Sequence, residues 1–301
     1  MTSPAILVCT APGERLDSYL AQLRENLSRS YIQRLIRQGY VLVNGRTAKP
    51  STRLALGDQV QINLPEATSQ ELVPEALPLN IVYQDEQVLV VDKPAGLTVH
   101  PGPGHSQGTL VNALLAHYPE LKEVGDPLRP GLVHRLDADT SGLMVVARTP
   151  LAYESLANQM RNRTVTKVYL ALVRGHPKPQ EGVIEAPIAR HPRDRQRMGI
   201  VAEGRQAATH YLTTKLFRGF ALLEVRPHTG RTHQIRVHMA ALGHPVAGDA
   251  KYGGRVPFLK RQFLHAHRLG FQLPPTMTHV EFTSALPPDL EAALATLGPS
   301  L

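Results

Sequence analysis

The chain has 301 residues, with 33 Lys or Arg against 25 Asp or Glu, so its formal net charge is +8 at pH 7. One cysteine excludes an intramolecular disulfide and any zinc site built on several thiolates, and no apolar run reaches the roughly 18 to 20 residues of a membrane span. Because the N-terminus lacks a secretory leader pattern, we expect a cytoplasmic protein with no membrane partner. The positive charge favours a polyanionic partner.

The positive charge is concentrated near the N-terminus. Residues 28–53 contain six basic residues and no acidic one: Arg29, Arg34, Arg37, Arg46, Lys49 and Arg53. Within them, the spacing of Tyr31, Ile32, Leu35 and Ile36 predicts a helix with one apolar stripe, capped by Ser28 or Ser30 and ended by Gly39. Arg34 and Arg37 then lie on the opposite face. An ordinary solvated basic face on a small domain is the alternative.

Two strands are expected after this helix. The first, residues 40–45, turns at Asn44-Gly45, and the second, residues 59–64, follows the turn signal at 56–58. Residues 66–78 are acidic, contain prolines and have no clear period, which is typical of a linker. We therefore expect a small domain at 1–65, a linker at 66–80 and a larger domain at 81–301.

The larger domain has a different pattern of apolar residues. From residue 79 onward, many short apolar runs are broken by Gly and Pro, which predicts strands, whereas 108–121 and 151–163 have helical period. Strands outnumber helices, and they do not alternate strictly with them. The sequence therefore predicts an α+β domain on a mixed, largely antiparallel sheet.

Polar residues interrupt two apolar regions of this domain. In GLVHRLDADTSGLMVVART, residues 131–149, Asp137 lies where an extended segment enters a turn. Asp137 or Asp139 could simply bond the loop backbone, as Asp often does in turns. The second region, residues 228–240, reads HTGRTHQIRVHMA, and its alternating apolar residues suggest a strand. We expect Arg231 to pair with Asp137, because an arginine keeps a carboxylate in a dry cleft ionised.

The motif HRLDADTSG, residues 134–142, resembles the HRLDxxTSG motif of the RluA/RluD family of pseudouridine synthases. Further matching segments follow in the same order, at 90–102, 167–175, 204–211, 230–254 and 261–269. Residues 13–64 are similar to an S4 RNA-binding domain, and this domain, with PIARHPRDRQRM at 187–198, is most similar to the RluD branch.

The resemblance implies an isomerase that converts uridine in RNA to pseudouridine by covalent catalysis, with no metal and no other cofactor. It implies that Asp137 is the nucleophile and that Arg231 pairs with it. It also implies that Tyr169 stacks on the uracil and that Arg135 fills the gap left by the extruded nucleotide. Whether Asp137 attacks the ribose C1′ or the base stays open. In the S4-like domain, the residues expected to face RNA backbone are Arg29, Arg34, Arg37 and Lys49.

By the same resemblance, the substrate is expected to be large-subunit (23S) ribosomal RNA, free or in a pre-50S particle, and the enzyme a monomer. Two alternatives stay open: a tRNA pseudouridine synthase and a non-catalytic rRNA-binding or ribosome assembly factor. A protein kinase is excluded because the motif order is Arg-Leu-Asp and the chain has no DFG, and a serine hydrolase because it has no GxSxG.

Overall fold

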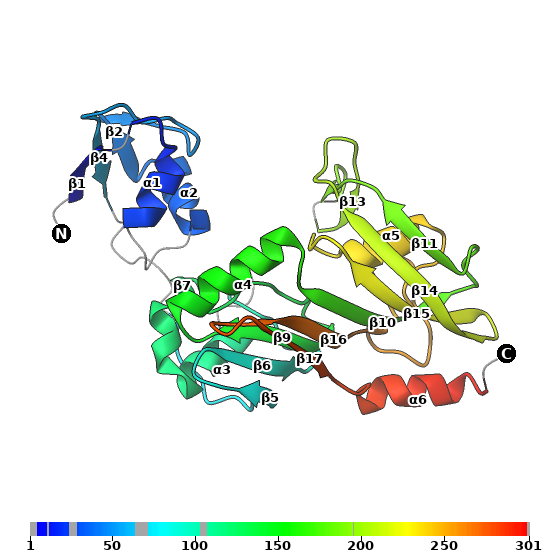
Figure 1. The fold of residues 1–301 in the computed structure, drawn as a ribbon. Coiled ribbons are helices and arrows are strands. Elements are labelled where there is room, and N and C mark those ends of the chain that lie inside the picture. The colour runs from blue at the N-terminus through cyan, green and yellow to red at the C-terminus, as the bar shows by residue number, and fades with distance from the viewer. Residues whose placement is uncertain are drawn as a thin grey trace.

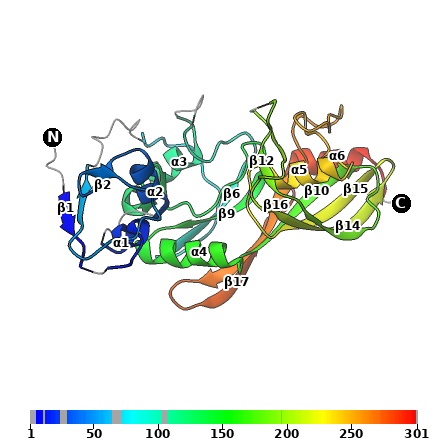
Figure 2. The same cartoon turned by 90° about the horizontal axis from the view of Figure 1, so that it is seen from above.

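A computed structural model describes residues 5–10, 12–23, 29–63, 72–102, 107–194 and 196–299. They form a small N-terminal body and a larger, elongated one (Figures 1 and 2). In these ranges, none of the helices combines the length and the apolar character that crossing a bilayer requires.

The small body packs two helices on a four-stranded antiparallel sheet of order β1-β4-β2-β3. Its elements are β1 (Ala5–Val8), α1 (Leu16–Leu23), α2 (Arg29–Arg37), β2 (Val41–Val43), β3 (Arg46–Thr47) and β4 (Gln59–Ile62). Ile32, Leu35 and Ile36 are buried in its core, which confirms the predicted apolar stripe. Asn44 and Gly45 both have positive φ, as the predicted hairpin turn requires. Ser28, one of the two predicted caps, lies outside the described residues.

The larger body is built on a nine-stranded sheet of order β11-β14-β15-β10-β16-β9-β6-β5, with β17 paired to β16. Its strands are β5 (Ile81–Gln84), β6 (Val88–Lys93), β9 (Ser141–Ala147), β10 (Thr166–Arg174), β11 (Glu181–Glu185), β14 (Ala208–Phe217), β15 (Phe220–Pro227), β16 (Leu264–Leu273) and β17 (Thr278–Thr283). β16 pairs with β9 in parallel, and the other pairs are antiparallel. The predicted mixed, largely antiparallel α+β architecture is confirmed.

Helices cover both faces of this sheet. They are α3 (Leu110–His117), the 3₁₀ turn η1 (Pro119–Glu123), α4 (Pro150–Asn162), α5 (Gln234–Ala241) and α6 (Pro288–Thr296). Two short hairpins complete the body, β7 (Gly125–Asp126) with β8 (Arg129–Pro130) and β12 (Ile188–Arg190) with β13 (Met198–Ile200). The helical periods predicted over 108–121 and 151–163 are confirmed by α3 with η1 and by α4.

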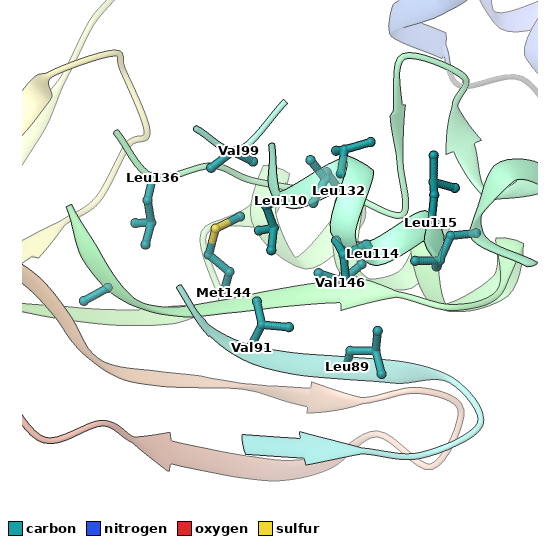
Figure 3. Close-up of a cluster of buried hydrophobic side chains, with 13 residues drawn as sticks. Leu89, Val91, Val99, Leu110, Leu114, Leu115, Leu132, Leu136, Met144 and Val146 are labelled. Atoms are coloured by element: carbon teal, nitrogen blue, oxygen red, sulfur yellow. The ribbon is translucent and has the colours of Figure 1, made fainter. Parts of the chain in front are cut away.

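β9 is buried on both faces, which explains its continuous apolar sequence. Met144 and Val146 face α3, where they meet Leu110 and Leu114 (Figure 3). Val145, pointing the other way, joins the cluster that contains Leu156 of α4 and Phe271 of β16. A strand covered on both faces needs no polar alternation. β9 is therefore a fixed support for the loop that precedes it.

The segment predicted as a strand within 228–240 is instead the helix α5, so that prediction is wrong. Ile235 and Met239, one helical turn apart, pack into the core over β10, β14 and β15, and Val237 enters a separate cluster. Residues that alternate in sequence can therefore all be buried on a helix that is enclosed on several sides. The Gln234 side chain accepts the Arg231 N–H and closes the turn before the helix.

Candidate active site

Asp137 lies in the loop between β8 and β9 and is held from both sides. Leu136, immediately before it, is buried in the core under α3 (Figure 3). Since neighbouring side chains of an extended segment point in opposite directions, Asp137 is directed away from that core. Its carbonyl accepts the Thr140 N–H at 3.1 Å. Its side chain keeps 17% of its surface exposed, so the carboxylate is accessible.

Gly142 explains how the loop comes close to the centre of the sheet. Its φ is +114°, and a Cβ there would collide with the backbone of Ala266 in β16. Ala266 pairs with Gly142 on one side and with Tyr169 of β10 on the other. The carboxylate loop and Tyr169 are thus separated by the width of one strand.

Arg236, in the first turn of α5, is the arginine that binds Asp137. Its Nη1 donates to Asp137 Oδ2 at 2.8 Å, while Nε and Nη2 donate to the two carboxylate oxygens of Asp249 at 2.6 and 3.0 Å. The prediction that Arg231 is this partner is wrong. Arg231 precedes the helix, and its Nε donates to the carbonyl of Gln206 at 3.1 Å. Because this segment is a helix and not the predicted strand, Arg236 reaches the carboxylate and Arg231 does not.

The charge of Arg236 is fixed by its two acidic partners. Burial opposes that charge, but the hydrogen bonds and negative charges of Asp249 and Asp137 outweigh it and raise the guanidinium pKa above its usual range. Asp249 is completely buried. Arg236 is therefore permanently charged, and its two hydrogen bonds to Asp249 fix its position beside Asp137.

His233 lies on the other side of the Asp137 carboxylate. Its Nε2 is 3.8 Å from Asp137 Oδ2, and its Nδ1 is 2.9 Å from the Tyr252 hydroxyl. Burial lowers the pKa of His233 to about 4, although the nearby Asp137 charge acts in the opposite direction. The imidazole is therefore neutral at pH 7 and does not neutralise the carboxylate.

Tyr169 lies near the start of β10, where the pairing with β16 shifts register at a bulge. Burial, and then the charge of Asp137, raises the pKa of its hydroxyl well above the usual value. The phenol therefore keeps its proton at neutral pH.

The predicted site residues of the larger body meet in one cavity of about 100 Å³. Asp137, Tyr169, Arg231 and Arg135 all line it, although they are up to 96 positions apart in sequence (231 − 135). A cavity with a carboxylate, a phenol and cationic walls can hold a polar, anionic substrate against a nucleophile.

The residues predicted in the S4-like domain lie mainly at its surface. Arg34 stacks over the ring of Tyr31 and approaches Asp126 of the larger body at 3.8 Å. Arg37 and Lys49 are exposed. The side chain of Arg29 lies outside the described part of the structure, so its predicted role stays a prediction, as do those of Arg34, Arg37 and Lys49.

Four further residues at or near the site were missed by sequence reasoning. Arg236 and His233 were visible in the polar cluster at 228–240, but the assignment of a strand led to the wrong choice. Asp249 gave no local signal. Lys93, also missed, is fully buried below the loop, and its ammonium donates to the carbonyls of Pro94, Leu97 and Ala138.

Comparisons with known proteins agree with this architecture. A family model described as RNA pseudouridylate synthase matches residues 87–241, and one described as S4 domain matches residues 14–60. The chain is 45% identical to the uncharacterized RNA pseudouridine synthase YlyB of Bacillus subtilis, over 95% of this chain and 94% of the relative. It is 44% identical to the ribosomal large subunit pseudouridine synthase D of Xanthomonas campestris, over 97% and 92%.

Among solved structures, human RNA Pseudouridylate Synthase Domain Containing 1 is similar, with a TM-score of 0.58 and 32% identity over 75% of this chain and 89% of that one. The mixed sheet, the central cavity and the S4 domain thus define an isomerase that acts on RNA. The chain belongs to the RNA pseudouridylate synthase family, and the resemblance noted in the sequence is confirmed.

Proposed function

We propose that this enzyme converts specific uridines of large-subunit ribosomal RNA to pseudouridine, with Asp137 as the nucleophile. The observation that carries the proposal is the ion pair between Asp137 and Arg236 at the wall of the cavity that Tyr169 also lines. We refer to this cavity below as the uridine cavity. The buried arginine donates a hydrogen bond to the carboxylate and holds it in one orientation, which covalent catalysis by that carboxylate needs. The substrate class is proposed from the relatives named ribosomal large subunit pseudouridine synthase D.

The proposed reaction begins when Asp137 forms a covalent bond with the target uridine. The bond between N1 and C1′ breaks, the uracil turns within the cavity, and C5 bonds to C1′; the bond between Asp137 and the uridine is also broken, which regenerates the free carboxylate. C5 then loses its proton and N1 carries one, so substrate and product have the same atoms. We propose that Tyr169 stacks on the uracil and borders the carbon that loses its proton.

Cationic residues would bring the RNA to this cavity. Arg135 is exposed beside Asp137 and is proposed to occupy the space that the extruded nucleotide leaves, which offsets part of the unstacking free energy of a few kcal/mol. Arg231 lines the same cavity, and the charges acting on it come from Arg205 and Arg163, which are also cations. It is proposed as an RNA contact. The S4 domain adds a second RNA-binding surface, with Arg34, Arg37 and Lys49.

We further propose that the enzyme acts as a cytoplasmic monomer, on free rRNA or on a pre-50S particle. The test is release of tritium from C5-labelled uridine in unmodified 23S rRNA transcripts, tRNA transcripts and pre-50S particles. We expect release by the wild type from an rRNA substrate and none by Asp137→Asn. Release of tritium from tRNA transcripts alone would show that the substrate is tRNA and not large-subunit rRNA. No release from any substrate, with normal rRNA binding, would favour an assembly factor.

A further inference from the structure

A second hollow, of about 320 Å³, opens beside the uridine cavity, and the two share Arg135 and Tyr169 as walls. We call it the basic hollow; the residues of interest in its lining are His100, Arg129, Leu132, Arg135, Met160 and Lys167. Its volume lies at the lower end of the range for ligand pockets, roughly 300–1,000 Å³. Apart from Arg135 and Tyr169, the proposed chemistry gives these residues no part.

The lining of the basic hollow carries one sign of charge. Arg129, Arg135 and Lys167 contribute cations, and none of the described lining residues is Asp or Glu. Burial lowers the pKa of Lys167, and no acidic neighbour offsets this effect. A partly buried cation without a counter-charge is costly, and an anionic ligand removes that cost.

His100 adds a buried polar atom without a partner. Its Nδ1 is inaccessible to solvent and makes no hydrogen bond within the described structure. Burial, together with the charges of Arg129 and Arg135, lowers the pKa of His100 to about 4. A neutral imidazole offers one donor and one acceptor, and buried polar atoms of native proteins normally have a partner. His100 therefore adds an uncharged polar side chain to the wall of the hollow.

The hollow also has an apolar wall, formed by Leu132 and Met160. A site for a phosphate group alone needs only charges and donors, whereas a nucleotide also presents a flat, largely apolar base. Because Arg135 and Tyr169 border both spaces, a ligand in the basic hollow lies directly beside one in the uridine cavity. Cations, an apolar wall and this adjacency together favour a nucleotide of the same RNA strand.

We propose that the basic hollow binds the nucleotide next to the target uridine, with its phosphodiester on Lys167 and Arg129 and its base against Met160. This inference rests on the proposed function in one respect, that the neighbouring cavity holds the target uridine. The enzyme would then recognise a short strand segment at the site of reaction, in addition to the RNA held by the S4 domain.

The first test measures RNA binding by the full-length protein in the Asp137→Asn background, which prevents turnover. Binding to a 23S rRNA transcript is measured over a range of salt concentrations with Lys167→Met or Arg129→Gln added. Lys215→Met is the matched control, because Lys215 is exposed on β14, lines neither space and gives the same change of charge as Lys167→Met. Thermal melting checks that each variant is folded.

Loss of one phosphate contact is expected to reduce the salt slope of log K by about 0.7. It should also raise Kd roughly tenfold, because a hydrogen bond to a charged group is lost. Lys215→Met should bind like its parent. Slopes and Kd values for Lys167→Met and Arg129→Gln that equal those of Lys215→Met would overturn the inference. This binding test needs no turnover, so it gives a result for the inference even if no transcript yields pseudouridine.

The second test locates the phosphate. In an RNA oligonucleotide centred on a uridine that the wild type converts, each neighbouring linkage is replaced in turn by a neutral methylphosphonate. At one linkage adjacent to the target, Lys167→Met should cause no further loss of binding, because the charge it contacts is already gone. If Lys167→Met instead caused an equal further loss of RNA binding at every linkage, Lys167 would act only through its long-range electrostatic attraction for RNA, and the inference would fail.

Discussion

Arg236 joins two carboxylates that are 112 residues apart in sequence (249 − 137): Nη1 donates to Asp137, whereas Nε and Nη2 donate to Asp249. The accessible carboxylate and the fully buried one therefore have different functions. Asp249 fixes the position of the guanidinium, and the guanidinium fixes Asp137. Since α5 packs on one half of the sheet and the Asp137 loop is anchored in the other, this contact connects the two halves.

Replacement of Arg236 should therefore be far more harmful than replacement of Arg231. Arg236→Met removes a buried charge from between two carboxylates, and breaking such a buried pair costs about 3–5 kcal/mol of stability. We expect a large drop in the free energy of unfolding and loss of pseudouridine formation. Arg231→Met should keep the wild-type stability within about 0.5 kcal/mol and mainly weaken RNA binding. Urea denaturation and single-turnover rates at saturating RNA distinguish the two, and equal destabilisation by both variants would contradict the assignment.

Tyr169 has an aromatic ring and a hydroxyl group, and two substitutions separate their contributions. Tyr169→Phe keeps the ring, so RNA binding should remain within about threefold, but it removes the hydroxyl that interacts with the charge of Asp137. If that hydroxyl takes part in the proton transfer at C5, the single-turnover rate should fall roughly 10²-fold or more. Tyr169→Leu should lose both binding and rate. A wild-type rate in Tyr169→Phe would restrict the residue to stacking.

His134 should make the fold sensitive to acid. Its Nε2 accepts the Val145 N–H of β9 at 3.0 Å, and burial, with the nearby charge of Lys167, lowers its pKa to about 3. Between that value and the ordinary 6.5, the unfolded chain binds a proton that the folded chain does not. The stabilisation is thus complete above pH 6.5 and is lost as the pH falls towards 3.

His134→Gln provides the comparison, because an amide oxygen can accept the same N–H without titrating. The wild type should lose stability more steeply than this variant between pH 6.5 and 4, as measured by thermal melting. The exposed His279, changed to Gln, serves as the control. If the melting temperatures of the wild type and His134→Gln changed with pH in parallel, the prediction would be wrong.

Lys93 should stabilise the loop that carries Asp137. Its ammonium donates to three carbonyls, including that of Ala138 next to Asp137, so Lys93→Met leaves three acceptors without that donor. We expect a loss of about 2–5 kcal/mol in the free energy of unfolding and a slower reaction.

The pH dependence of this loss has a defined sign. Burial lowers the pKa of Lys93 from 10.5 to about 7. Between these values the unfolded chain binds the additional proton, so the wild type gains stability relative to Lys93→Met as the pH rises from 7 to 10. Urea denaturation of both proteins at pH 7 and pH 9 measures the difference, and a smaller difference at pH 9 would contradict the lowered pKa of Lys93.

The sequence by itself determined the features that depend on neighbouring residues. The apolar stripe of α2, the Asn44-Gly45 turn and the helical periods of α3 and α4 are local patterns, and each formed as expected. The motif around Asp137 was also recognisable without coordinates, because its residues are contiguous.

Only the tertiary structure decided which distant groups meet. The alternation of Ile235, Val237 and Met239 suits a strand, but burial on several sides makes the segment a helix, and this change brings Arg236 rather than Arg231 to Asp137. Asp249 and Lys93 have no local pattern that marks them. Their partners are supplied by other parts of the fold, and hydrogen bonds between such parts depend on the sheet order and the packing of α5, which no short stretch of sequence encodes.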